Sequence, residues 1–96
     1  MKLTNLQREC ITDAGIYPLK IIERNDLAPT KARAHNGQMY GAQTLRALID
    51  RHWLAVDNGY IKANDDGLYQ LPRQDALSVM ALKCLMASLN RRAVRG

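Results

Sequence analysis

One stretch of the chain carries side chains that can read a nucleic acid. Gln43, Thr44, Arg46 and Asp50 lie close together in the sequence. An arginine can bind guanine and a glutamine can bind adenine, each through two hydrogen bonds in the major groove. A carboxylate such as Asp50 is repelled by phosphates unless it accepts a hydrogen bond from cytosine or orients a neighbouring arginine. The set therefore suits recognition of duplex DNA, and the alternative is an ordinary solvated surface.

Further cations are candidates for holding the phosphate backbone. Lys31 and Arg33 form a small basic cluster with His35 before this stretch, and Arg51 follows it. Lysine and arginine bind phosphates and make the affinity for DNA fall as salt is added. A solvated loop is the alternative interpretation of residues 31–35.

The segment 57–66 is acidic. Lys62 is its one cation, beside Asp57, Asp65 and Asp66. Segments that follow phosphates usually carry lysine or arginine. This composition favours a surface that faces away from DNA or toward a protein partner, although aspartate and glycine are also the ordinary residues of turns.

The residues that could bind a metal or perform catalysis lack the required spacing. The only cysteines and histidines are Cys10, Cys84, His35 and His52, and they do not form the paired spacings of zinc sites. His52 is better interpreted as a residue at a helix C-terminus that interacts with the dipole. The phosphate-loop, nucleophile-elbow and zinc-protease motifs do not occur in the sequence. We therefore expect no enzymatic activity, no metal and no cofactor.

The elements around Arg46 are a helix followed by two short strands. Leu45, Leu48, Ile49 and Trp53 recur at helical spacing, which puts the polar side chains on the opposite face. Residues 60–63 and 68–71 then have the pattern of strands, joined by the turn-rich segment 64–67.

A helix with a polar outer face that runs into a β-hairpin resembles the recognition helix and wing of winged helix-turn-helix domains. The resemblance covers residues 41–71 and implies an α+β fold that binds DNA in transcriptional control. It implies that Gln43 and Arg46 contact base edges. The residues that it implies for the DNA backbone are Thr44, Arg51, Lys31, Arg33 and Lys62. Such folds also serve as interaction modules, so the alternative is a protein-binding adaptor or a small inhibitor without DNA contact.

The segment before this helix has a clear start and an ambiguous middle. Residues 4–14 read as a helix, with a capping box from Thr4 to Gln7 and Gly15 after its end. Residues 17–22 favour a strand, with a short helix starting at Pro18 as the alternative. Residues 27–34 show no period and suit one or two helical turns from Pro29. Residues 35–37 read as a break, and residues 38–40 as a short extended segment.

A second strong helix occupies residues 74–91, and it is apolar around more than half of its circumference. A small domain covers only one side of such a helix, so the other side needs a partner. We expect a homodimer whose interface contains Leu77, Met80, Cys84, Leu85 and Leu89. The alternative is a central core helix of a monomer. This division predicts a winged-helix-like domain over 1–72 and a dimerisation helix with a basic tail over 73–96.

The composition describes one globular domain. The chain has 96 residues, of which 47% are apolar, enough for a modest core. The net charge of +5 suits a polyanionic partner, although the C-terminal Arg91, Arg92 and Arg95 supply much of it. Residues 1–20 lack the apolar core of a signal peptide, and no apolar run approaches transmembrane length. We therefore expect a cytoplasmic protein with reduced cysteines.

Overall fold

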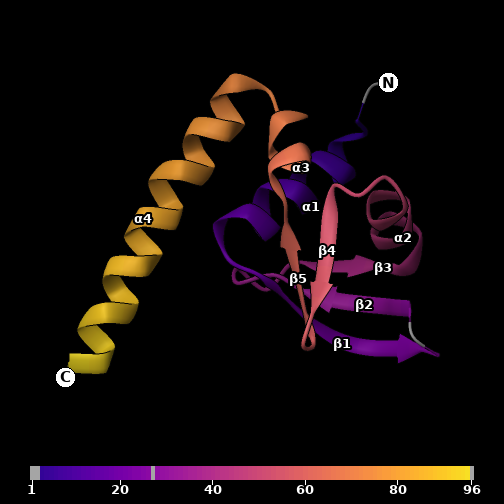
Figure 1. Ribbon diagram of the computed structural model, residues 1–96, viewed down its shortest axis with the longest axis horizontal. Coiled ribbons are helices and arrows are strands. Elements are labelled where there is room, and N and C mark those ends of the chain that lie inside the picture. Colours follow the sequence, from indigo (N-terminus) through magenta and orange to yellow (C-terminus); the bar gives the residue numbers. More distant parts are fainter. Residues whose placement is uncertain (1–2, 27, 96) are drawn as a thin grey trace.

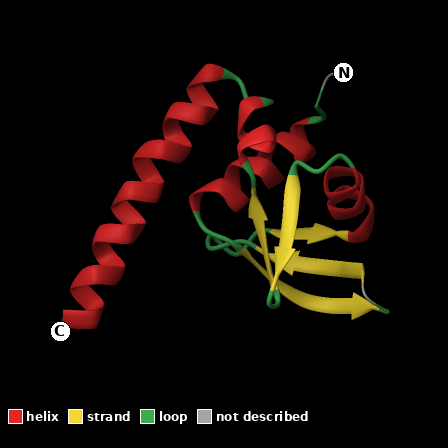
Figure 2. Ribbon diagram, in the orientation of Figure 1, coloured by secondary structure: helices red, strands yellow, loops and turns green. Residues whose placement is uncertain are grey.

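The computed structural model describes residues 3–26 and 28–95, with side chains described as far as Ser88. Within these residues, four helices and a five-stranded antiparallel sheet form an α+β domain (Figures 1 and 2). The elements are α1 (Asn5–Ile16), β1 (Leu19–Asn25), β2 (Ala28–Arg33), β3 (Met39–Gly41), α2 (Ala42–Asp50), β4 (Leu54–Asp57), β5 (Tyr60–Ala63), α3 (Asp65–Tyr69) and α4 (Arg73–Arg95).

The sheet has the strand order β3-β2-β1-β5-β4. Figure 1 shows that it is strongly twisted, because β4 and β5 run steeply across the direction of β1 and β2. The helices α1 and α2 lie on one face of this sheet and enclose the core with it. Inward-facing side chains of Ile11, Leu19, Leu45, Leu48 and Ile61 are all fully buried there.

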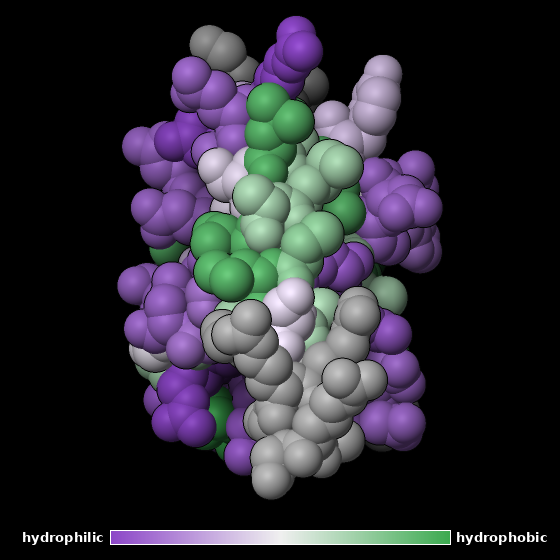
Figure 3. Space-filling view, turned by 90° about the vertical axis from the view of Figure 1, so that its left-hand side faces the viewer, coloured by the Kyte–Doolittle hydropathy of each residue, from purple (hydrophilic) through white to green (hydrophobic). Residues whose placement is uncertain are grey.

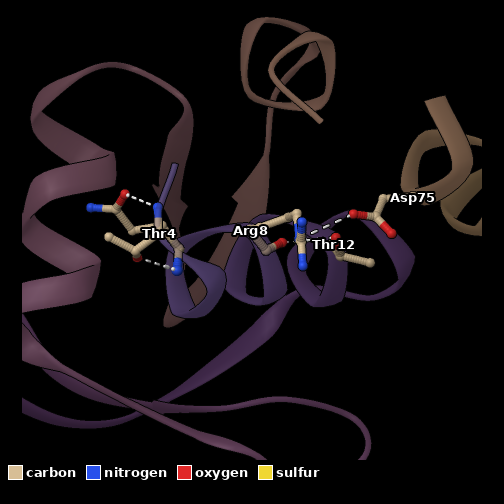
Figure 4. Close-up of polar contacts among 5 residues, drawn as sticks. Thr4, Arg8, Thr12 and Asp75 are labelled. Carbon is tan, nitrogen blue, oxygen red and sulfur yellow. Dashed lines mark hydrogen bonds and ion pairs between the residues drawn. The ribbon is translucent and has the colours of Figure 1, made fainter. Parts of the chain in front are cut away.

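The first predicted helix is confirmed, and its start is the capping box (Figure 4). The Gln7 backbone N–H donates to Thr4 Oγ1 at 3.1 Å, and the Thr4 N–H donates to Gln7 Oε1 at 3.1 Å. The helix ends at Ile16 rather than at residue 14, so the role predicted for Gly15 is wrong. A Cβ atom on Gly15 would lie 2.7 Å from Leu68 Cδ2 and 2.9 Å from Val79 Cγ1. Glycine is needed here because α3 and α4 pack closely on α1.

The ambiguous middle segment forms three strands. The strand predicted at residues 17–22 is confirmed as β1, but it begins at Leu19, because Tyr17 is the C-cap of α1, and it runs to Asn25 before the turn at Asp26. The helical turns predicted after Pro29 are wrong, because this segment is β2, which pairs with β1 on one side and β3 on the other. The short side chains of this segment do not give the clear alternation of a strand. Its strand conformation is stabilised by pairing with β1 and β3 and not by local propensity.

The predicted hairpin has a different partner strand. Residues 60–63 form β5 as predicted, but β5 pairs with β4, and residues 65–69 form the helix α3. Asn58 and Gly59 make the turn, with φ angles of 48° and 84°. Asn-Gly adopts two successive positive φ angles more easily than other pairs, as a two-residue hairpin requires. The polar segment that suggested a turn is instead a cap, in which Asn64 Oδ1 accepts from the Gly67 N–H at 2.9 Å.

The last predicted helix is confirmed as α4, which lies along one side of the domain (Figure 1). Its inner side packs on α1 through Val79, which is 2% exposed, and through the half-buried Ala76 and Met86. Arg8 Nε lies 3.4 Å from Asp75 Oδ2 across the two helices, and the Thr12 hydroxyl donates to the Arg8 carbonyl at 2.8 Å (Figure 4). Among the described residues, no helix combines the length and apolar character needed to cross a membrane.

A polar group is buried between α1 and β3. Asp13 is 9% exposed, and its Oδ2 accepts a hydrogen bond from the Tyr40 hydroxyl at 2.5 Å. Burial, with a smaller contribution from Asp13, raises the pKa of Cys10 from 9.0 to about 12. Burial and then the Asp13 hydrogen bond raise the pKa of Tyr40 above its ordinary value of 10.0. Both groups therefore favour their protonated forms in the folded state.

These two groups predict a loss of stability in alkali. A folded-state pKa above the unfolded value contributes stability that is complete below the unfolded pKa and is lost as the pH rises toward the folded pKa. The melting temperature should therefore fall as the pH rises from about 9 to about 12. Thermal unfolding followed by circular dichroism across this range measures the effect. Cys10→Ala should flatten the decline, and an identical slope in this variant would contradict the assignment to Cys10.

Candidate nucleic-acid interface

The outer face of α2 carries the predicted base-reading side chains. Leu45 and Leu48 face the core, so Gln43, Arg46 and Asp50 are exposed on the opposite side. The helix begins at Ala42, with Gly41, the last residue of β3, as its N-cap, and a short turn after Asp50 leads into β4. A strand of the sheet therefore adjoins α2 at each end. The sequence predicted this exposed face correctly, because Leu45 and Leu48 set the phase of the helix.

Arg46 is held only loosely. Its Nε lies 4.0 Å from Asp50 Oδ2, one helical turn away, and the two side chains are 82% and 71% exposed. An ion pair this exposed contributes little to stability. Because this pair is weak, another anionic group can compete with Asp50 for Arg46.

Two of the predicted cations lie along α2. The backbone of a third, Lys31, lies beside the start of the helix, because Lys31 pairs with Gly41 in the sheet. Its side chain lies on the face of β2 opposite the buried Ala32, away from α2, with Nζ 3.7 Å from Glu23 Oε2. Arg46 occupies the middle. Arg51 is the C-cap residue, and its guanidinium carbon lies 5.2 Å from the centre of the Trp53 ring. This contact holds Arg51 by a cation–π interaction. Thr44 is half-buried in the first turn of the helix.

Arg33 and Lys62 lie on a different surface. Successive side chains of a strand point to opposite faces, and Ala32 is fully buried beneath the helices. Arg33 is therefore on the outer face of the sheet, turned away from α2. On β5, Ile61 is buried in the same way, so Lys62 is exposed, with its Nζ 3.4 Å from Asp57 Oδ2. The fold separates these two cations from the base-reading face.

The outer face of the sheet holds a basic row that sequence reasoning missed. Lys20 lies directly opposite Arg33 on β2 and opposite Tyr60 on β5, and all three are exposed. Like charges opposite each other on adjacent strands are destabilising. Within the described part of the chain, neither Lys20 nor Arg33 forms an ion pair with a carboxylate. Strand alternation could have indicated that each is exposed, but their pairing depends on the register.

An open groove of about 720 Å³ borders α2. Arg46, Ile49 and Asp50 line it from the helix, Val56 lines it from β4, and residues 25, 26 and 28–30 line it from the β1–β2 connection. Its charged residues are Asp26, Arg46 and Asp50, so the groove carries both signs of charge. Its apolar wall and mixed charge suit a polypeptide better than a phosphate backbone.

The predicted soft metal ligands are dispersed. His35 lies in the turn before β3, His52 follows α2 with a φ of 62°, Cys10 is buried in α1 and Cys84 is exposed on α4. Over the residues that the structure describes, no group of three or more His, Cys, Asp or Glu residues is placed to hold a metal ion.

Comparison of the chain with protein-family models, with curated proteins and with solved structures gives no match.

Proposed function

We propose that this protein binds duplex DNA through α2, as a transcriptional regulator with a winged-helix-like arrangement. The observation that carries the proposal is the exposed face of Gln43, Arg46 and Asp50 on a helix that leads directly into the β4–β5 hairpin. The second strand of that hairpin returns to pair with β1. In this proposal α2 presents these side chains to a major groove, and the β4–β5 hairpin acts as the wing.

Each cation near α2 has a distinct role in this proposal. Arg46 and Gln43 contact base edges, and Asp50 orients Arg46 before binding. Thr44 and Arg51 contact phosphates at the two ends of the helix, which fixes its position on the duplex. The side chains of Lys31, Arg33 and Lys62 face away from α2, so they contribute through long-range attraction of the polyanion.

Replacing Arg46 tests the proposal. Arg46→Ala should remove the preference for a specific sequence at a cost of about 1–3 kcal/mol, whereas Lys31→Ala should weaken binding to all sequences alike. Fluorescence anisotropy with duplexes selected from a random library measures both effects, at several salt concentrations. Affinity should fall steeply as salt is added.

Arg73→Ala is the matched control for this experiment. Arg73 is an exposed arginine at the start of α4, outside the proposed interface. The Arg73→Ala substitution changes the net charge by the same amount as Arg46→Ala. Equal losses in the two variants would show that charge alone drives the binding. Absence of binding to duplex DNA at low salt would refute the proposal.

The groove beside α2 favours a second candidate function, a protein-binding adaptor. Val56 is 40% exposed on its wall, and Asp26 and Asp50 would repel phosphates. In this case a peptide segment occupies the groove and DNA does not bind. Val56→Glu should then abolish binding to a protein partner while leaving the melting temperature nearly unchanged. Low-salt DNA titration separates the two candidates, because only the first requires DNA binding.

A further inference from the structure

The outward side of α4 is a continuous apolar surface. We define the α4 strip as Leu77, Met80, Ala81, Cys84 and Leu85. The side chain of Leu89, which the sequence also predicts for the interface, lies outside the described residues. The three large side chains of the strip are 55%, 65% and 55% exposed, in the order Leu77, Met80 and Leu85. Figure 3 shows the surface as a hydrophobic band along the side of the molecule where α4 lies, with hydrophilic residues on both flanks. Leu82 lies at the edge of the strip and is 42% exposed.

The strip lies on the side of α4 that does not pack against the rest of the domain. The side of α4 that faces α1 is already occupied by Val79, Ala76 and Met86. Between Asp75 and Arg91 the helix contains one charged residue, Lys83. The exposed side chains of the strip and its edge amount to roughly 400 Å² of apolar surface, which is the size of the largest apolar patch on a typical monomer, and such a patch is often functional.

We infer that a second copy of this chain covers the α4 strip, with the two α4 helices antiparallel about a two-fold axis. A two-fold interface must be complementary to itself: where residue i of one copy contacts residue j of the other, residue j of the first copy contacts residue i of the second. An axis placed between Ala81 and Cys84 satisfies this condition. Ala81 then faces Cys84 of the other copy, and Met80 faces Leu85.

Around the axis, this pairing matches small residues with small ones and large residues with large ones. Ala81 and Cys84 at the centre let the two helix backbones approach closely. Met80 and Leu85 pack on either side of that contact, and the flexible Met80 side chain adapts to the available space. Leu77 falls toward the end of the contact, opposite Ser88 of the other copy. The spacing of three and four residues is the pattern with which one helix packs along another.

Charge favours the antiparallel orientation. Arg91, Arg92 and Arg95 lie near the end of α4. A parallel pair would bring two such clusters together, whereas an antiparallel pair places them at opposite ends of the contact. The strip supplies about half of the roughly 800 Å² per partner that a standard interface buries. Polar residues at its margins supply the rest, as the rim of an interface does.

Sedimentation equilibrium in the micromolar range tests this inference, which does not depend on DNA binding. The wild-type protein should have twice the mass of the 10.8 kDa chain. Leu85→Glu should give monomers, because it buries two charges close to the axis. Leu6→Glu is the matched control and should remain dimeric, since Leu6 is a 43% exposed leucine on α1, outside the strip.

Cysteine cross-linking provides a second measurement on the wild-type chain. Cys84 is exposed and Cys10 is fully buried, so a short thiol-specific bifunctional reagent reacts at Cys84. The inference predicts a covalent dimer that Cys84→Ser and Leu85→Glu both abolish. A monomeric mass for the wild-type protein, or a Leu85→Glu protein that remains dimeric, would overturn it.

Discussion

Replacing Gly67 with alanine is expected to destabilise the protein by about 2–4 kcal/mol. A Cβ atom at this position would lie 2.2 Å from the Trp53 carbonyl oxygen and 3.0 Å from its carbonyl carbon. Both atoms belong to the backbone, so no side-chain rotation relieves the clash. The Trp53 oxygen also accepts from the Asn64 N–H at 3.2 Å. The whole of α3 would have to move away from the segment that follows α2.

The sign of the effect makes this a sharp test. Glycine to alanine in an unobstructed helix stabilises by about 1 kcal/mol, so only the close approach to Trp53 makes the substitution unfavourable. The melting temperature should fall by roughly 10–25 °C, at about 4–8 °C per kcal/mol for a domain of this size. Thermal unfolding measures it.

Gly41→Ala is the control for Gly67→Ala. A Cβ atom on Gly41 would meet nothing within 4 Å, and its φ of −92° is ordinary for any residue. Its cost should be about 1 kcal/mol or less, which is the difference between glycine and alanine at a helix N-cap. An unchanged or raised melting temperature for Gly67→Ala would mean that α3 does not lie against Trp53 as described.

Leu48→Ala is expected to destabilise the protein by about 2–5 kcal/mol. Leu48 is fully buried on the inner side of α2, among the side chains that join this helix to the sheet and to α1. The loss combines the transfer free energy of the deleted atoms with the cost of the cavity that they leave. Urea unfolding measures this free energy directly.

Leu6→Ala is the comparison for Leu48→Ala, because Leu6 is 43% exposed and buries less surface. It should cost less than Leu48→Ala, about 1 kcal/mol, since removing a side chain that is nearly half exposed leaves no closed cavity. Equal effects of the two substitutions would place the core elsewhere and would reverse the face of α2 that is available to a ligand. The stability data therefore also bear on the DNA-binding proposal.

The hairpin illustrates what a pattern of residues can and cannot predict. Tyr60–Ala63 alternates as a strand should, and it is one. The sequence predicts its partner strand at residues 68–71, because the segment 64–67 has the composition of a turn, whereas the partner on that side is β4. Asn64 and the aspartates after it begin α3 instead, where a capping side chain and early acidic residues are equally favourable. The Asn58-Gly59 pair was the stronger turn signal.

The sequence by itself determined the features that depend on neighbours within a few residues. The capping box at Thr4 set the start of α1, the spacing of Leu45 and Leu48 set the inner face of α2, and the long apolar run set α4. Each follows from local hydrogen bonds or from helical periodicity, which requires no knowledge of distant residues.

Only the tertiary structure decided the features that depend on strand pairing. The sheet brings Lys20, Arg33 and Tyr60 together from three strands, and it turns Arg33 away from α2. A shift of one residue in register would move each of these side chains to the other face. The same pairing places β2, whose sequence has no strand signal of its own, between β1 and β3. The register depends on long-range contacts, because no local pattern specifies which strands meet.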